Sequence, residues 1–159
     1  MAQEIERKFL VKDDRWRSLA SGVKYAQGYI PRGNATTVRV RIAGEKAYLT
    51  IKSPVIGITR AEYEYPIPLQ DAEEMLANLC DHPIIEKYRY AIPWGDLVWE
   101  VDEFLGDNLG LVIAEVELTH EDQRFELPPW IDREVHDARY RNAALVNHPY
   151  CAWSKAEKG

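Results

Sequence analysis

The chain has 159 residues, of which 46% are hydrophobic and 29% charged, and its net charge is −6. These values exclude a disordered chain and are typical of a soluble domain with its own core. The acidic balance argues against general nucleic-acid binding, and no stretch approaches the roughly 20 apolar residues that span a bilayer. Because Cys80 and Cys151 lie outside any metal-binding pattern, we expect ordinary reduced thiols and a cytoplasmic protein.

Short alternating stretches with the two-residue period of a strand occupy most of the chain. They predict eight strands, at residues 3–11, 25–31, 36–43, 46–53, 59–67, 84–92, 96–105 and 111–119. Turn residues connect several of these stretches, as at 43–46 and 93–96. Short connections favour an antiparallel sheet, and a closed barrel leaves no free edge. We therefore expect an eight-stranded antiparallel closed barrel.

Three segments predict helices, at residues 13–20, 70–79 and 137–147. The second offers Asp71 as a cap with Glu74 three residues later, in the pattern of a capping box. The third has Asp137 as its expected cap and closes the domain, and the tail after Trp153 is expected to be loose. The predicted fold class is mainly β with flanking helices (α+β), in a single domain over residues 1–159 with the helices packed outside the barrel.

Charged side chains recur on one face of the predicted strands. In the first strand, Glu4, Glu6 and Lys8 share a face, whereas Ile5 and Phe9 share the other. The same alternation places on the charged face of later strands Arg39, Arg41, Lys52, Arg60, Glu62, Glu64, Lys87, Arg89, Glu100, Asp102, Glu115 and Glu117. A solvated outer face would explain each strand taken alone. However, like charges two residues apart lie roughly 6–7 Å from each other and repel, so we expect this face to line the inside of the barrel.

The two kinds of charge point to two kinds of ligand. Carboxylate pairs form an oxygen-rich site for Mg²⁺ or Mn²⁺. Clusters of Arg and Lys bind phosphate oxygens. An anion pocket alone leaves the acids unexplained, and a calcium site alone leaves the bases unexplained. The combination is typical of a site for a metal-bound polyphosphate.

The ordered set of motifs resembles a known family. Glu4-x-Glu6-x-Lys8 is similar to the N-terminal signature of the triphosphate tunnel metalloenzymes, also called the CYTH domain family. The resemblance extends to about residue 150 and includes Arg39-x-Arg41, Lys52, Glu62-x-Glu64, Lys87-x-Arg89, Glu115-x-Glu117 and Asp137-x-Arg139-Tyr140-x-Asn142. The pattern is most similar to the compact bacterial members, of the inorganic triphosphatase type.

This resemblance implies a barrel that forms a charged tunnel and hydrolyses triphosphates with Mg²⁺ or Mn²⁺, two ions per site. It implies metal binding by Glu4, Glu6, Glu115 and Glu117, with help from Glu62, Glu64 and Asp102. It implies substrate binding by Lys8, Arg39, Arg41, Lys52, Lys87 and Arg89, with Arg139 near one tunnel mouth. The expected catalytic residues are Lys8, Tyr29 and Arg41, with Tyr29 orienting Lys8. Glu100 fits the charge pattern and fits equally well as a structural partner of an inward Arg, and Arg60 fits a rim position.

The expected reaction is hydrolysis of inorganic tripolyphosphate to phosphate and pyrophosphate, with weaker activity on nucleoside triphosphates. The reason is that the inward groups include no apolar slot in which a base would stack. Adenylyl cyclase and thiamine triphosphatase remain alternatives on the same tunnel. A non-catalytic polyphosphate- or nucleotide-binding module is disfavoured, because binding alone needs fewer acids. The expected partner is a small-molecule triphosphate, with neither DNA nor a membrane, and a homodimer stays open.

Overall fold

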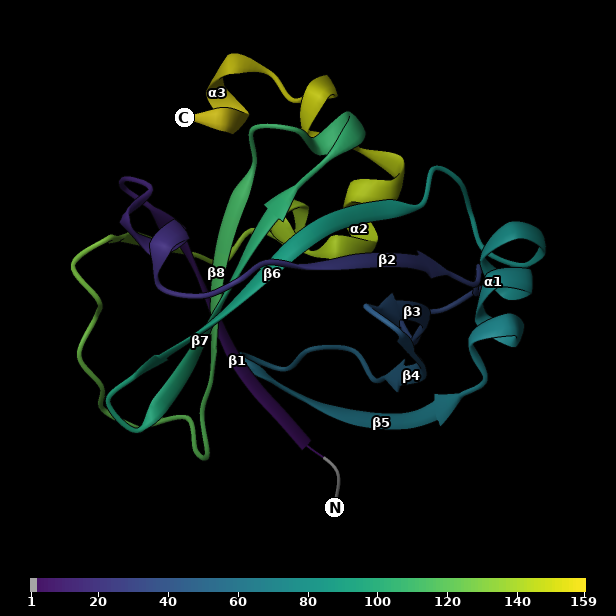
Figure 1. Ribbon diagram of the computed structural model, residues 1–159, viewed down its shortest axis with the longest axis horizontal. Coiled ribbons are helices and arrows are strands. Elements are labelled where there is room, and N and C mark those ends of the chain that lie inside the picture. The colour runs from purple at the N-terminus through teal and green to yellow at the C-terminus, as the bar shows by residue number, and fades with distance from the viewer. Residues whose placement is uncertain (1–2) are drawn as a thin grey trace.

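The computed structural model describes residues 3–159. Within this range the strands are β1 (Gln3–Val11), β2 (Val23–Tyr29), β3 (Thr37–Ala43), β4 (Lys46–Lys52), β5 (Thr59–Ile67), β6 (Ile85–Trp94), β7 (Leu97–Phe104), β8 (Val112–Glu117) and β9 (Ile131–Val135). They hydrogen-bond in the order β5-β4-β3-β2-β6-β7-β8-β1-β9, and β1 also pairs with β5. The pairing of β1 with β5 closes β1 to β8 into the expected eight-stranded antiparallel barrel (Figure 1).

The ninth strand lies outside the barrel and was not predicted. It pairs with the second half of β1, where Phe9 faces Glu134 and Val11 faces Ile131. Its five residues, Ile-Asp-Arg-Glu-Val, are apolar only at the two ends, so they lack the alternation that marked the other strands. A contact with a distant part of the chain stabilises the strand, because Arg7 of β1 donates a hydrogen bond to Glu134 at 2.8 Å.

Two of the three predicted helices differ from the prediction. Residues 13–20 form only a 3₁₀ turn, η1 (Arg15–Ser18), which inserts the buried Trp16 into the core. α1 (Leu69–Asn78) is found close to its predicted place, but it begins after Pro68, and Asp71 lies in its first turn without capping it. The closing helix is broken into η3 (Ala138–Tyr140) and α2 (Asn142–Asn147), with an extended backbone at Arg141 between them.

The expectation of a loose C-terminal tail was wrong. Trp153 is buried, and the chain continues through η4 (Tyr150–Ala152) into α3 (Lys155–Lys158). Ser154 and Glu157 form a reciprocal capping box at the start of α3. The backbone oxygen of Glu157 accepts a hydrogen bond from Arg139 at 3.0 Å, which ties the tail to the segment before α2.

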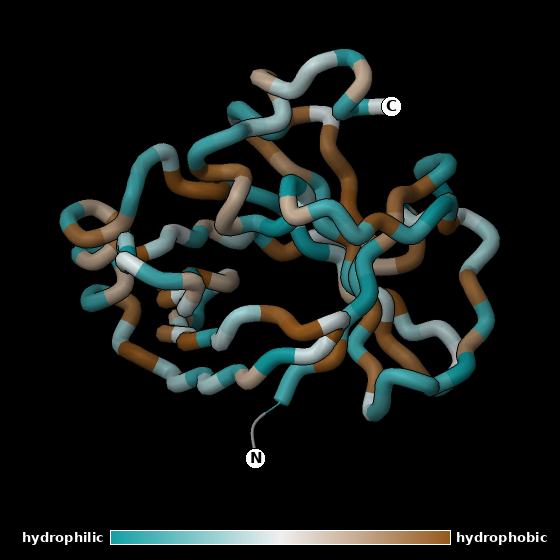
Figure 2. Tube along the Cα trace, turned by 180° about the vertical axis from the view of Figure 1, so that it is seen from behind, coloured by the Kyte–Doolittle hydropathy of each residue, from teal (hydrophilic) through white to brown (hydrophobic). Residues whose placement is uncertain are grey.

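Apolar side chains on the outer faces of the strands form three clusters under the surrounding segments. α1 covers β3 and β4 through Val40, Ala72 and Leu76. The C-terminal segment, yellow in Figure 1, packs Leu145 and other apolar residues against Ile85 of β6 and Ile113 of β8. The backbone N–H of Tyr150 in this segment donates to Asn108 of η2 (Gly106–Asn108) at 2.8 Å. The third cluster contains Trp16, Trp99 and Trp130. Hydrophobic and hydrophilic residues alternate along many strands (Figure 2), so the opposite faces of these strands are left for the interior.

Both cysteines are unbridged; Cys80 is buried and Cys151 is exposed. Within residues 3–159, no helix has the length and apolar character needed to cross a membrane.

Candidate active site

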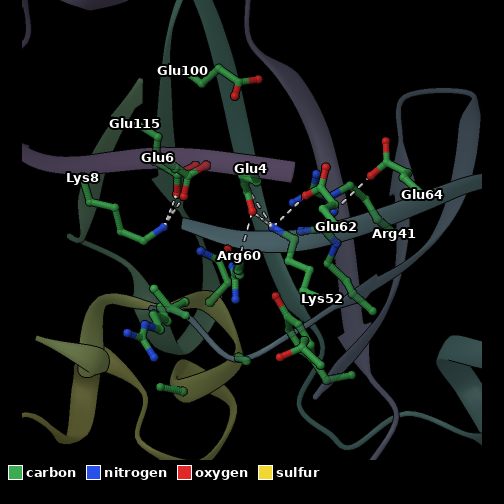
Figure 3. Close-up of a pocket in the computed structure, with 18 of the residues that line it drawn as sticks. Glu4, Glu6, Lys8, Arg41, Lys52, Arg60, Glu62, Glu64, Glu100 and Glu115 are labelled. Atoms are coloured by element: carbon green, nitrogen blue, oxygen red, sulfur yellow. Dashed lines mark hydrogen bonds and ion pairs between the residues drawn. The ribbon is translucent and has the colours of Figure 1, made fainter. Parts of the chain in front are cut away.

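The barrel encloses a polar cavity of about 590 Å³ (Figure 3). All eight barrel strands contribute side chains to its wall, and these come from the charged faces identified in the sequence. The cavity is lined by thirteen of the fifteen predicted site residues, namely Glu4, Glu6, Lys8, Tyr29, Arg39, Arg41, Lys52, Glu62, Glu64, Lys87, Arg89, Glu115 and Glu117. Asp102 and Arg139 are absent from its lining.

The order of strands around the barrel divides the wall into two halves. The acidic half consists of the neighbouring strands β7, β8, β1 and β5, which carry the inward carboxylates. The basic half consists of β4, β3, β2 and β6, which carry inward Lys and Arg side chains except on β2. The inward face of β2 is neutral and holds Tyr25, Gln27 and Tyr29. Lys8 and Arg60 are basic residues within the acidic half.

Carboxylates in the acidic half face one another across neighbouring strands. Glu6 lies opposite Glu117, and Glu100 lies opposite Glu115. Like charges directly opposite each other destabilise a sheet. Burial and the charge of Glu115 raise the pKa of Glu6 to about 8. Burial, together with the nearby carboxylates, also raises the pKa of Glu117. The carboxylates of this half therefore repel one another and resist full ionisation.

Lysines lie between the carboxylates in the present arrangement. Lys8 Nζ is 2.7 Å from a Glu6 oxygen and 3.0 Å from a Glu115 oxygen. Lys52 Nζ lies in the same way between Glu4, at 2.9 Å, and Glu62, at 3.1 Å (Figure 3). Within residues 3–159, no three acidic, His or Cys side chains converge as a ready-made metal site. The donors are nevertheless all carboxylate oxygens, which is the ligand type that Mg²⁺ and Mn²⁺ prefer.

Ion pairs cross the border at which β5 of the acidic half lies beside β4 of the basic half. One of them also involves β1. Glu4 binds Lys52, and it also accepts a hydrogen bond from Arg60 Nε at 3.2 Å. Burial opposes ionisation of Glu4, but the charge and hydrogen bond of Lys52 outweigh it and lower the pKa of Glu4 to about 2. Arg39 reaches Glu64 at 3.3 Å on the same side of the barrel. These five side chains thus link β1 and β5 to β3 and β4.

The opposite border, between β6 and β7, depends on Asp102. This side chain is fully buried and accepts hydrogen bonds from Lys87 Nζ at 2.7 Å and from Arg89 Nε at 2.7 Å. Burial opposes its ionisation, but the charges of Arg89 and Lys87 lower the pKa of Asp102. Because both carboxylate oxygens are occupied by cations and Asp102 does not line the cavity, the geometry suits a residue that holds Lys87 and Arg89 in place.

The centre of the basic half carries uncompensated positive charge. Burial and the charges of Arg39 and Arg89 lower the pKa of Arg41 to about 10. Across the described part of the chain, Arg41 makes no ion pair, and its Nε donates instead to Gln27 Oε1 at 2.8 Å. The ring of Tyr25 lies 5.0 Å from the guanidinium carbon of Arg41 and 5.0 Å from that of Arg89. Such rings attract cations without neutralising them, so this surface is suited to a polyanion.

Residues 2–144 match the CYTH domain family. The chain belongs to this family. As a CYTH protein it is 53% identical over 151 residues to an inorganic triphosphatase of Acetivibrio thermocellus, covering 94% of this chain and 97% of the relative. It is 39% identical over 149 residues to an inorganic triphosphatase of Nitrosomonas europaea, covering 90% and 96% of the two chains. The crystal structure of an inorganic triphosphatase is similar at a TM-score of 0.65 and 36% identity, covering 92% of this chain and 95% of the other.

Two predicted site residues of this CYTH protein make other contacts than expected. Tyr29 lines the cavity, but its hydroxyl accepts from Gln27 Nε2 at 2.7 Å, and no hydrogen bond within residues 3–159 joins it to Lys8. Arg139 turns away from the cavity, where it pairs with Asp137 at 2.8 Å and lies over the ring of Trp153. Arg139 belongs to η3, which the extended backbone at Arg141 separates from α2, so it does not lie on the continuous closing helix that the sequence predicted.

The sequence interpretation also missed residues that the fold brings to the cavity. Tyr25, Arg141 and Asn142 line its wall, and the buried Gln27 contacts three neighbouring polar side chains. For Tyr25 and Gln27 a signal was available, since the two-residue period places them on the same face as Tyr29. Asn142 belonged to a recognised motif, but nothing local indicated its contacts.

Proposed function

We propose that this protein is an inorganic triphosphatase that hydrolyses tripolyphosphate to phosphate and pyrophosphate with a divalent metal ion. The observation that carries the proposal is the division of one cavity into an acidic and a basic half. A polyphosphate with bound cations presents both charges, and it matches both halves at once. Two curated relatives, at 53% and 39% identity, are named inorganic triphosphatases, which supports the same substrate.

The basic half supplies the proposed phosphate-binding groups. Arg41 has a neutral partner, so its charge remains available to an incoming phosphate oxygen. Arg39, Lys87 and Arg89 are held by carboxylates at the two borders and are therefore already oriented before the substrate arrives. Charges that are fixed in advance stabilise a phosphoryl-transfer transition state without a cost of reorganisation. These residues would stabilise the negative charge on the phosphoryl oxygens as the terminal P–O bond breaks and water attacks.

The acidic half supplies the proposed metal ligands. CYTH membership implies dependence on a divalent metal, and the crowded carboxylates, with the pKa of Glu6 raised to about 8, fit that requirement. We assign the binding of Mg²⁺ or Mn²⁺, as two ions, to Glu4, Glu6, Glu62, Glu64, Glu115 and Glu117. A bound divalent ion supplies Lewis acidity toward phosphoryl oxygens and water. Lys8 and Lys52 lie between these carboxylates and would hold them apart until the ions and substrate arrive.

The deciding experiment compares kcat/KM for tripolyphosphate, ATP and thiamine triphosphate under one metal and one salt concentration, with product analysis. We expect tripolyphosphate to be preferred, with phosphate and pyrophosphate as products. Arg41→Ala protein, purified identically, controls for contaminating phosphatases. A tenfold preference for ATP or thiamine triphosphate, about 1.4 kcal/mol in transition-state binding, would contradict the proposal. Formation of cyclic AMP would identify a cyclase, and binding without turnover would identify a binding module.

A further inference from the structure

Two neutral amides connect the cations of the basic half. Gln27 is fully buried, its Oε1 accepts from Arg41 Nε at 2.8 Å, and its Nε2 donates to Asn142 Oδ1 at 3.2 Å. The same oxygen of Asn142 accepts from Lys87 Nζ at 2.8 Å. Arg41 on β3 and Lys87 on β6 are thus joined through a residue of β2 and a residue of α2.

We propose that Gln27 and Asn142 act as one positioning pair, which holds Arg41 and Lys87 in the geometry that binds and stabilises the phosphates. We call these two residues the amide pair. The inference rests on the proposed triphosphatase function, which it deepens by assigning roles to two residues outside the charged motifs.

The neutrality of the amide pair is central to this role. Asp102 also orients Lys87, but as a carboxylate it cancels positive charge. An amide oxygen accepts a hydrogen bond from a cation and leaves its net charge in place. Arg41 therefore obtains an orienting partner while its full charge stays available to the substrate. Replacing an amide by a carboxylate would instead create an internal ion pair that competes with phosphate.

The amide pair also links the wall to the docking of the C-terminal segment. Asn142 is the first residue of α2, directly after the extended backbone at Arg141. α2 is anchored by Leu145 and Val146, which pack in the same apolar cluster as Ile85 at the start of β6. Since α2 supplies an acceptor for Lys87, packing of this helix completes the hydrogen-bonding of the basic half.

The test is a double-mutant cycle with Gln27→Met and Asn142→Leu, which keep side-chain volume and remove the hydrogen-bonding groups. We expect each single variant to lower kcat for tripolyphosphate by about tenfold to a hundredfold, the range for misplaced catalytic groups. The double variant should lie within about threefold of the worse single variant, because residues that act as a unit are not additive. Melting temperatures separate this effect from unfolding, and Asn142→Ala replaces Asn142→Leu if the latter does not fold. Asn147→Leu, an exposed position on the same helix, should leave kcat unchanged.

A second readout separates the amide pair from the proposed function. Calorimetry measures tripolyphosphate binding in excess chelator, where only the protein's own groups bind it. Folded single variants should bind more weakly than the wild type and show the same non-additivity. Absence of wild-type turnover would contradict the proposed function, whereas the affinities would still decide the role of the amide pair. Unchanged affinity and turnover in folded variants, or effects of the two substitutions that simply multiply, would overturn the inference.

Discussion

The two halves of the tunnel wall satisfy their charges in different ways. In the basic half, the cations are paired with carboxylates at the borders or lie against neutral groups such as Gln27 and Tyr25. In the acidic half, Glu6 and Glu117 lie opposite each other on the neighbouring strands β1 and β8, and the pKa of Glu6 is raised to about 8. The basic half is thus arranged for its ligand in advance, whereas the acidic half carries repulsion that a cation would relieve.

The two borders between the halves also differ. At the β6–β7 border, Asp102 and Lys87 are both fully buried. At the β4–β5 border, Arg39 of β3 reaches Glu64 of β5, and the Arg39 side chain is buried but that of Glu64 is 39% exposed. Removing one partner of a buried ion pair leaves the other charge buried with neither a counter-charge nor water around it. In an exposed pair, water solvates the charge that remains. The Asp102–Lys87 pair should therefore contribute more to stability than the Arg39–Glu64 pair.

Metal removal should have the largest effect, because it acts on the half that carries uncompensated carboxylates. Excess chelator is expected to abolish tripolyphosphate hydrolysis, and Mg²⁺ or Mn²⁺ should restore it. The measurement is phosphate release, with a thermal melt in chelator to show that the protein is still folded. Full turnover in excess chelator would contradict the metal role of the acidic half.

Loss of the central cation should come next. Arg41→Ala is expected to lower kcat/KM for tripolyphosphate by about a hundredfold or more, as when a fixed charge stabiliser is removed. The adjacent Val40 is fully buried on the outer face, so Val40→Ala should cost about 2 kcal/mol of stability and leave kcat largely intact. A folded Val40→Ala protein as inactive as Arg41→Ala would show that the two faces of β3 are wrongly assigned.

The difference in burial between these two ion pairs predicts unequal stability losses. Asp102→Asn should reduce the free energy of unfolding by about 3–5 kcal/mol, because Lys87 and Arg89 lose a buried counter-charge. Glu64→Gln should reduce it by less than about 1 kcal/mol. Urea denaturation of the metal-free proteins measures both. Equal losses would mean that burial does not distinguish the two ion pairs.

The smallest effect should be a gain in stability from Glu6→Gln. Since the pKa of Glu6 is raised from 4.5 to about 8, the folded protein binds more protons than the unfolded chain between these values. Stability therefore falls as pH rises through this window. In chelator at pH 8, Glu6→Gln should melt about 2–4 °C above the wild type, and the difference should shrink toward pH 5.

A glutamate with the opposite shift serves as the control for that experiment. Arg7 lowers the pKa of Glu134 through a hydrogen bond, so Glu134→Gln should lower the melting temperature at pH 8. If Glu6→Gln also lowered it at pH 8, the crowding of carboxylates in the acidic half would be contradicted.

The sequence alone was sufficient to predict the barrel and, for every barrel strand except β2, the face that lines it. The reason is that the two-residue period of a strand is local, so Glu4, Glu6 and Lys8 share a face whatever their neighbours are. The same reasoning predicted α1 closely, because its apolar stripe is also local. It failed for β9, whose pairing with β1 depends on a strand far away in the sequence.

Only the tertiary structure decided which charges meet. Closure of β1 on β5 places the acidic strands next to one another, and pairing of β2 with both β3 and β6 places Gln27 between Arg41 and Lys87. The break at Arg141 turns Arg139 toward the tail and brings Asn142 to the cavity. Strand order and helix breaks arise from packing between distant segments, so a local pattern identifies the charged residues of the tunnel without identifying their partners.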